Sequence, residues 1–308
     1  VEGTEEDQAD CLNGVGLAMT GAGRSEAALA PYSLALDIYR QLPGTELDQA
    51  NCLHSTANAL DDVGRYAEAV EAYRQSLELY RQVGRTSREQ ANCLYNIGGT
   101  LRRARRYEEA MTSYRQALET YRRVEGTTQD QGICLENTGN TLRRAGRPEE
   151  ALTAYRKALA SYRKVEGSER DQADCLGGIG RALDALKRRE EALSAYRQAL
   201  EAYRAVPGTV RQQADCLLRA GNALDDLDRC AEALEAYHQA LEAYQLEGAT
   251  RGQANCLYNI GGTLRRLGRY AEALEAYRQA LEAYRQVEGS ERDQADCVIN
   301  TGRALDAL

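Results

Sequence analysis

Residues 90–103 read QANCLYNIGGTLRR, and residues 253–266 repeat the same fourteen letters. The cysteine in this stretch belongs to a series that spans the chain. Its members are 41 residues apart, with a single spacing of 40, and only Cys230 falls outside the series: Cys11, Cys52, Cys93, Cys134, Cys175, Cys216, Cys256 and Cys297. A fixed period of this length is typical of repeat proteins, whose units pack only on their neighbours.

One unit, residues 250–290, contains two amphipathic patterns. The apolar or small residues between Cys256 and Leu267 fall on one side of a helix that turns by about 100° per residue. Gly268 follows and predicts the end of this helix. A second apolar stripe, from Ala273 to Val287, predicts a longer helix. Each unit is therefore predicted to be a pair of helices, here called the first and the second helix.

Most series cysteines have a Ser or Thr seven residues before them, followed three residues later by Asp, Glu or Gln. This spacing is that of the capping box, in which two side chains satisfy free backbone amides at a helix start. The unit of Cys256 departs from the pattern, because Thr250 is shifted by one residue, and we expect an irregular junction there. Capping boxes are predicted at Thr4, Thr45, Thr86, Thr127, Ser168, Thr209 and Ser290.

The sequence GRYAEALEAYRQAL, at residues 268–281, closely resembles the tetratricopeptide repeat. The preceding helix adds the matching pattern Leu257, Ile260, Gly261 and Leu264. The long period is similar to that of kinesin light chains and of bacterial signalling proteins with such arrays. The resemblance implies an all-α fold, a right-handed superhelical solenoid whose first helices line the concave face. It also implies binding of peptides or proteins, and no chemical reaction.

We predict one array over residues 1–308, with seven helix pairs and a final first helix, and expect it to be a segment of a longer chain. The predicted units lie near residues 4–44, 45–85, 86–126, 127–167, 168–208, 209–248, 249–289 and 290–308.

The composition argues against several classes of partner. A net charge of −8 argues against a general nucleic-acid binder. No apolar run approaches the roughly 18 residues of a membrane span. We therefore predict no nucleic-acid and no membrane partner. If the cysteines are reduced, they favour a cytoplasmic location.

The spacing of the cysteines and histidines does not predict a catalytic or metal site. Zinc ligands cluster in fours, and a disulfide needs Cα atoms about 4.4–6.8 Å apart, whereas these cysteines are one helix pair apart. Packing as small hydrophobic residues is the interpretation that remains. His54 and Cys52 point to different sides of a helix, and His238 is too far from Cys230, so neither histidine is expected to form a Cys–His dyad. We predict no enzyme, cofactor or metal.

The residues that differ between otherwise copied units mark the candidate binding surface. They lie on the polar side of the predicted first helices. Asn amides can pair with an extended peptide backbone, and Arg pairs can hold carboxylates. The candidates are Asn58, Asp61, Asp62, Tyr95, Asn96, Arg102, Arg103, Asn137, Asn140, Arg143, Arg144, Arg181, Asn222, Asp225, Asp226, Tyr258, Asn259, Arg265, Arg266 and Asn300.

The leading hypothesis is a non-enzymatic scaffold that binds a protein or an extended peptide in a groove along the first helices. The two copies of QANCLYNIGGTLRR would place two equivalent basic patches there, separated by an acidic stretch, which predicts a partner with acidic positions. The alternative is structural. Because Val298, Leu305 and Leu308 keep an apolar side on the last helix, the solenoid could associate end to end into filaments.

Overall fold

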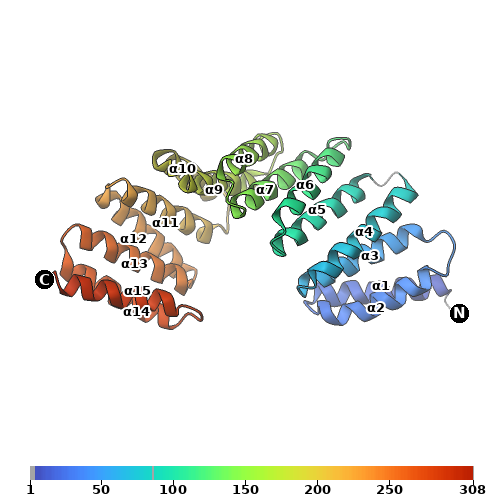
Figure 1. Ribbon diagram of the computed structural model, residues 1–308, viewed down its shortest axis with the longest axis horizontal. Coiled ribbons are helices and arrows are strands. Elements are labelled where there is room, and N and C mark those ends of the chain that lie inside the picture. The colour runs from blue at the N-terminus through green and yellow to red at the C-terminus, as the bar shows by residue number, and fades with distance from the viewer. Residues whose placement is uncertain (1–3, 85–86, 308) are drawn as a thin grey trace. The chain divides into compact units, whose positions relative to one another are not determined.

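The computed structural model describes residues 4–84 and 87–307, and every regular element in them is an α-helix (Figure 1). The chain divides into two compact units, residues 1–161 and 162–308. The first unit contains four helix pairs, formed by α1 (Glu5–Gly21), α2 (Ser25–Tyr39), α3 (Glu46–Asp62), α4 (Tyr66–Val83), α5 (Ser87–Arg103), α6 (Tyr107–Tyr121), α7 (Thr128–Arg144) and α8 (Pro148–Tyr162). The all-α class predicted from the sequence is confirmed.

The second unit contains three helix pairs and a final first helix. Its elements are α9 (Glu169–Ala185), α10 (Arg189–Arg204), α11 (Val210–Asp226), α12 (Cys230–Leu246), α13 (Thr250–Arg266), α14 (Tyr270–Arg285) and α15 (Glu291–Leu305). The odd-numbered elements are the predicted first helices and the even-numbered elements the second helices. The two copies of QANCLYNIGGTLRR lie in α5 and α13.

The turn between the two helices of a pair has a left-handed residue at its centre. Gly64 and Gly268 have φ of 79° and 74°, values that glycine adopts without steric cost. Arg105, Lys187 and Asp228 stand at the same place in other pairs, with φ of 60°, 58° and 59°. The turn geometry is therefore kept even where a side chain makes it costly.

The junction between pairs differs from the capping boxes predicted for it. Among the predicted positions that the structure describes, only Thr4 forms the box, with Asp7. Thr127 is buried, and its hydroxyl donates backwards to the carbonyl oxygens of Tyr121 and Val124, at 2.6 and 2.8 Å. The same backward bonds occur at Thr45, Ser168, Thr209 and Ser290, and Thr86 lies outside the described residues.

The prediction holds at Thr4 and was wrong at these five positions, because the tight junction points their hydroxyls at the free carbonyls that end the preceding second helix. The irregular junction is confirmed, since Ala249 stands before α13 with ψ of 76°, whereas Thr45, Thr127, Ser168, Thr209 and Ser290 have ψ of 14–21°.

Tyrosines and cysteines fill the space between helices. Tyr114 packs so closely on α5 that a Cβ placed on Gly98 would lie 2.7 Å from its ring. The Cys134 thiol donates to the carbonyl oxygen of Tyr114 on the preceding second helix, at 3.1 Å. Seven of the eight series cysteines are buried, as predicted. Cys11 is exposed, contrary to the prediction, because among the described residues no second helix precedes α1 to cover it.

Candidate functional site

The candidate residues are distributed over the first helices of both units. In the first unit α3 holds Asn58, Asp61 and Asp62, α5 holds Tyr95, Asn96, Arg102 and Arg103, and α7 holds Asn137, Asn140, Arg143 and Arg144. In the second unit α9 holds Arg181, α11 holds Asn222, Asp225 and Asp226, α13 holds Tyr258, Asn259, Arg265 and Arg266, and α15 holds Asn300. Consecutive first helices contact one another, for example α5 with α7 and α13 with α15.

Asparagine side chains link one first helix to the next. Asn137 donates from Nδ2 to the Tyr95 hydroxyl at 3.0 Å, and Asn300 donates to the Tyr258 hydroxyl at 2.9 Å. Asn259 donates to Asn222 at 2.9 Å. Amides that were expected to await a ligand are therefore engaged within the protein. Asn137 and Asn300 hold the two half-buried tyrosines, Tyr95 and Tyr258.

The two copies of QANCLYNIGGTLRR build the same surroundings for these tyrosines. Tyr95 and Tyr114 have ring centroids 5.7 Å apart, and Tyr258 and Tyr277 have centroids 5.8 Å apart. Each copy is flanked by an equivalent ion pair, Arg88 with Asp130 at 2.9 Å and Arg251 with Asp293 at 3.2 Å. A pocket of about 290 Å³ opens beside the first copy, lined by His54, Asn92, Tyr95, Asn96, Tyr121, Asp130 and Ile133.

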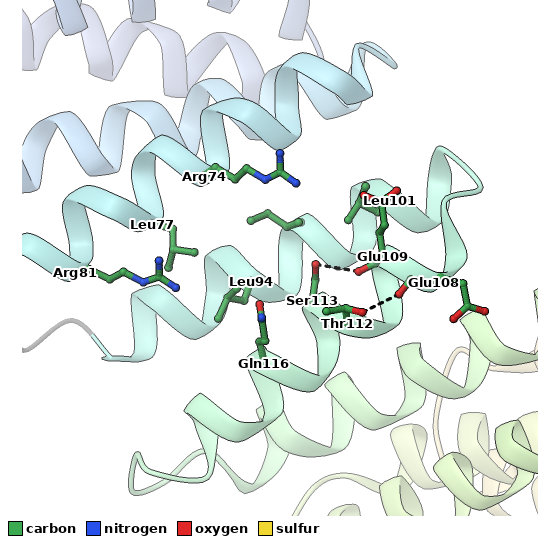
Figure 2. A pocket seen from close by; sticks show the side chains of 11 residues that line it. Arg74, Leu77, Arg81, Leu94, Leu101, Glu108, Glu109, Thr112, Ser113 and Gln116 are labelled. Atoms are coloured by element: carbon green, nitrogen blue, oxygen red, sulfur yellow. Dashed lines mark hydrogen bonds between the residues drawn. The ribbon is translucent and has the colours of Figure 1, made fainter.

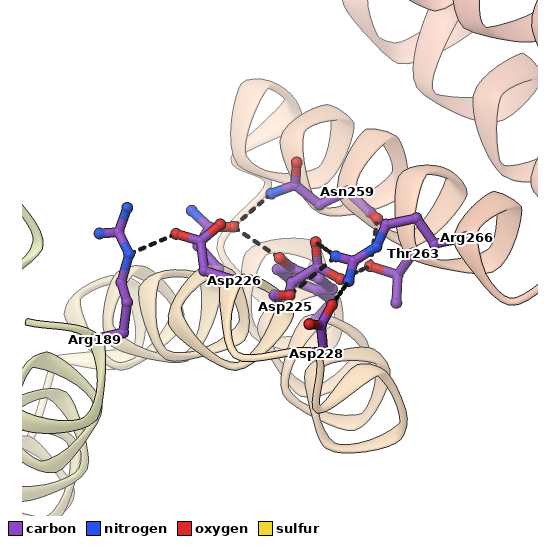
Figure 3. A network of polar contacts seen from close by, with 9 residues as sticks. Arg189, Asp225, Asp226, Asp228, Asn259, Thr263 and Arg266 are labelled. Carbon is purple, nitrogen blue, oxygen red and sulfur yellow. Dashed lines mark hydrogen bonds and ion pairs between the residues drawn. The ribbon is translucent and has the colours of Figure 1, made fainter. Parts of the chain in front are cut away.

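The charged candidates are partly neutralised between repeats. Arg103 of α5 forms an ion pair with Asp61 of α3. In the second unit Arg266 bridges to Asp225 at 2.7 Å, and Arg189 reaches Asp226 at 2.7 Å (Figure 3). One arginine of each predicted basic patch, Arg103 and Arg266, is thus paired with an aspartate of the preceding first helix.

The first arginine of each pair behaves differently from the second. Arg102, Arg143 and Arg265 are half-buried, and the Nε atom of each is buried without a hydrogen-bond partner among the described residues. Arg144 is exposed, and Arg181 is half-buried on α9. The hydrogen-bond donors of this surface that lack a partner among the described residues are therefore the Nε atoms of Arg102, Arg143 and Arg265.

The structure also reveals a Cys–His contact that the sequence analysis missed. His54 Nδ1 lies 3.3 Å from the thiol of Cys93, one repeat later, and Asn96 Nδ2 lies 3.1 Å from His54 Nε2. Burial raises the pKa of Cys93 to about 11 and lowers the pKa of His54. At neutral pH this pair is a shielded thiol beside a neutral imidazole. It therefore offers no thiolate nucleophile, and the buried thiol is not accessible to a substrate.

This contact shows which signal could have revealed the pair. The comparison of His54 with Cys52 considered one helix only, whereas the residue two positions after a cysteine faces the next repeat's first helix. A search across a full period would have matched His54 with Cys93.

A larger pocket, of about 400 Å³, lies elsewhere in the first unit (Figure 2). Arg74 and Arg81 of α4 form one wall, and Glu108 and Glu109 of α6 contribute to the other. Glu109 is paired with Arg106, and Glu108 with Arg147. Because its walls carry opposite and partly paired charges, this pocket selects for no particular ligand charge.

Two further classes of site are absent from the described part of the chain. Residues 4–84 and 87–307 contain no group of three or more His, Cys, Asp or Glu side chains placed to hold a metal ion. Within these residues, no helix combines the length and the apolar character needed to cross a membrane.

The paired helices, the packed tyrosines and the varied first-helix side chains define a helical repeat protein of the tetratricopeptide class. The tetratricopeptide-repeat profile matches residues 7–82, 48–123, 89–164, 131–205 and 212–286. These matches cover most of the sequence, and the chain belongs to the tetratricopeptide repeat family. No curated protein matches the chain.

Solved structures share the fold at low sequence identity. RapI in its apo form superimposes with a TM-score of 0.72 at 15% identity, over 92% of this chain and 78% of that one. A putative kinesin light chain of Podosopora anserina, with nearly identical TPR-like repeats, gives 0.57 at 15%, over 67% and 100%. A Rap protein complexed with Competence and Sporulation Factor gives 0.57 at 16%, over 92% and 77%.

Proposed function

We propose that this chain is a non-enzymatic scaffold that binds an extended peptide of a partner protein across its first helices. The observation that carries the proposal is the duplicated surface of α5 and α13. Packing requires the buried residues of QANCLYNIGGTLRR to recur in each copy, but it does not require tyrosine at positions 95 and 258. Both are nevertheless present, half-buried and held by an asparagine of the following first helix.

Such tyrosines suit peptide recognition. A fixed aromatic ring provides a large contact area at a small cost in side-chain entropy, and aromatic residues dominate many binding interfaces. The Rap protein in complex with Competence and Sporulation Factor offers a precedent for ligand binding by this fold.

The test uses random linear peptides displayed on phage and selected on the whole chain. Selected peptides should bind Tyr95→Ala with Tyr258→Ala at least about tenfold more weakly, since truncation of an aromatic anchor costs ~2 kcal/mol or more. The matched control changes Arg115→Ala with Arg278→Ala, two exposed and equivalent positions of α6 and α14. Equal loss in both double variants, or no selected peptide at all, would overturn the proposal.

A second candidate is end-to-end self-association. One observation favours it, since Val298, Ile299 and Leu305 of α15 are 56%, 50% and 54% exposed. On this hypothesis light scattering shows a molar mass that rises with concentration, and Ile299→Lys suppresses the rise. A constant monomer mass at high concentration would remove this candidate.

We further propose a cytoplasmic location. All nine cysteines lie in the described part of the chain as thiols outside any disulfide, and most are buried, which suits a reducing compartment. Fractionation of cells that express the whole gene tests this point, and recovery from an oxidising compartment would contradict it.

A further inference from the structure

The second helices α8, α12 and α14 share their buried tyrosines, alanines and leucines but differ in the charge of their exposed sides. In α14 the exposed Glu275 and Glu282 are each followed three residues later by an arginine. This spacing places opposite charges side by side on the surface of a helix. The exposed side of α14 is therefore close to balanced in charge.

The exposed side of α8 departs from this balance toward positive charge. Compared with the same stretch of α14, residues 153–166 differ at five positions, and four of these differences change the charge. Thr153 and Ala160 replace two glutamates. Lys157 and Lys164 replace two glutamines. All four side chains are exposed, so packing in the interior does not require any of these changes.

These changes leave a row of cations on α8 and on the turn that follows it. Arg197 of α10, which stands at the place of Arg156, pairs with Glu232 at 3.6 Å. Arg81, at the place of Arg163 in α4, pairs at 3.6 Å with an acid three residues earlier, where α8 has Ala160. The cations of α8 are exposed and form no ion pair within residues 4–84 and 87–307, and we call them the basic stripe: Arg156, Lys157, Arg163 and Lys164.

The exposed side of α12 departs in the opposite direction. Residues 235–245 differ from the same stretch of α14 at two positions, where His238 and Gln245 replace arginines. Glu235 and Glu242 are kept and exposed, and neither forms an ion pair in the part of the chain that the structure describes. We call these two glutamates the acidic stripe.

The two stripes match in spacing as well as in sign. Lys157 and Lys164 are seven residues apart, and so are Glu235 and Glu242. Seven residues on a helix are about two turns, or roughly 10.5 Å. Both charges of one stripe can therefore meet both charges of the other when the two helices lie side by side.

We propose that the chain associates with a second copy of itself by placing the basic stripe of one copy on the acidic stripe of the other. The formal net charge of −8 makes whole copies repel, so association requires a local region of opposite sign, and α8 provides one. Exposed complementary charges set orientation and encounter rate more than affinity, so this association is weak and sensitive to salt. It depends neither on peptide binding nor on the apolar side of α15.

Sedimentation equilibrium of the whole chain measures this association. The average mass should rise with concentration at an ionic strength of about 0.1 M, where charges act over about 10 Å. The rise should vanish at about 1 M, where charges act over about 3 Å. End-to-end contact through apolar side chains is not weakened by screening, and Ile299→Lys should leave the association at about 0.1 M in place.

Charge reversal tests each stripe separately. Changing all four cations of the basic stripe to Glu should raise the dissociation constant about tenfold or more, and Glu235→Lys with Glu242→Lys should do the same. The milder Lys157→Gln with Lys164→Gln, which restores the residues of α14, should raise it about threefold. The matched control, Arg170→Glu with Arg211→Glu, reverses two exposed charges on α9 and α11 and should change it less than about threefold.

A mixture of the two reversed variants provides the closing test. Each variant alone carries one sign of charge on both stripes, whereas an equimolar mixture brings opposite signs together again. Association should therefore return in the mixture, in complexes with equal amounts of the two chains. A constant monomer mass of the wild type at about 0.1 M, association that survives both reversals, or no association in the mixture would each overturn the proposal. Circular dichroism of every variant verifies that the fold is kept.

Discussion

At the scale of single residues, the series cysteines mark where a first helix meets the second helix before it. The Cys52 thiol donates to the Tyr32 carbonyl oxygen at 3.4 Å, and Cys134 does the same with Tyr114 at 3.1 Å. Burial was predictable because an uncharged residue that recurs on the apolar side of a helix packs inside. The exposure of Cys11 was not predictable from this pattern, since it depends on which helix precedes α1.

Thiol labelling tests this account of the cysteines. In the native protein Cys11 and Cys230 should react rapidly, because the first is exposed and the second is half-buried. The other seven should react only on unfolding, since they are buried and burial raises the pKa of thiols such as Cys134 to about 12. Mass spectrometry after brief alkylation identifies the cysteines that have been labelled. Rapid native labelling of Cys52 or Cys134 would contradict the packing.

The same pKa shifts predict an alkaline loss of stability. A thiol with a raised folded pKa adds stability below its unfolded pKa of about 8.5, and that stability is lost as the pH rises toward the folded value. For Cys93 the folded value is about 11. The free energy of unfolding should therefore fall from about pH 9 to pH 11, by up to ~1.4 kcal/mol per pH unit and thiol.

Urea unfolding across this range measures the effect. Cys93→Ala with Cys134→Ala should flatten the decline, and an unchanged slope would show that these thiols are not shielded in the folded state.

The asparagines show where sequence reasoning at this scale stops. Their polarity and recurrence identified a common surface, but Asn137 and Asn300 bond to tyrosines that are 42 residues earlier. That pairing is set by the contact between first helices, which no single repeat contains.

At the scale of elements, helices and turns followed from the sequence, and the junctions did not. The capping pattern was present in the sequence, but the buried hydroxyl of Thr127 donates to the end of the preceding helix and caps no backbone amide of its own helix. At the start of its own helix it accepts only from the Gln131 side chain, at 3.2 Å. A pattern fixes the spacing of two side chains, whereas their direction depends on the backbone of the junction.

The Thr127→Asp substitution distinguishes the two interpretations. An N-cap position would accept Asp without loss. In this junction a buried carboxylate would face the carbonyl oxygens of Tyr121 and Val124, so we expect destabilisation of about 2–3 kcal/mol. Thr127→Ser is the control, because Ser168 and Ser290 make the same bonds elsewhere. Chemical denaturation of both variants measures the change in the free energy of unfolding. Equal stability of the Asp variant and the wild type would support an N-cap role for Thr127.

The turns between paired helices permit a stabilising change. Lys187 is exposed and has φ of 58°, in the left-handed region. Lys187→Gly should raise the free energy of unfolding by about 1 kcal/mol, because glycine removes the steric cost of that conformation. The reverse change at the equivalent turn, Gly146→Lys, should lower it by a similar amount. A loss of stability in Lys187→Gly would contradict the assigned turn strain.

At the scale of the whole molecule, the period was the most informative signal. It predicted the order of the helices and the recurrence of one surface in both units. It could not predict that Asp61 neutralises Arg103, or that Asp225 neutralises Arg266 (Figure 3). Exposed ion pairs contribute little stability, about 0–1 kcal/mol each, so their main effect is on the charge that a partner meets. A partner would consequently meet less positive charge at Arg103 and Arg266 than the sequence suggested.

Hydrogen–deuterium exchange of the whole chain, with and without a selected peptide, tests the central claim most directly. The account predicts added protection in residues 90–103 and 253–266, the two copies on the first helices, and little change in residues 107–121 and 270–285 of the second helices. Protection confined to the second helices, or in neither copy, would contradict binding through the first-helix surface.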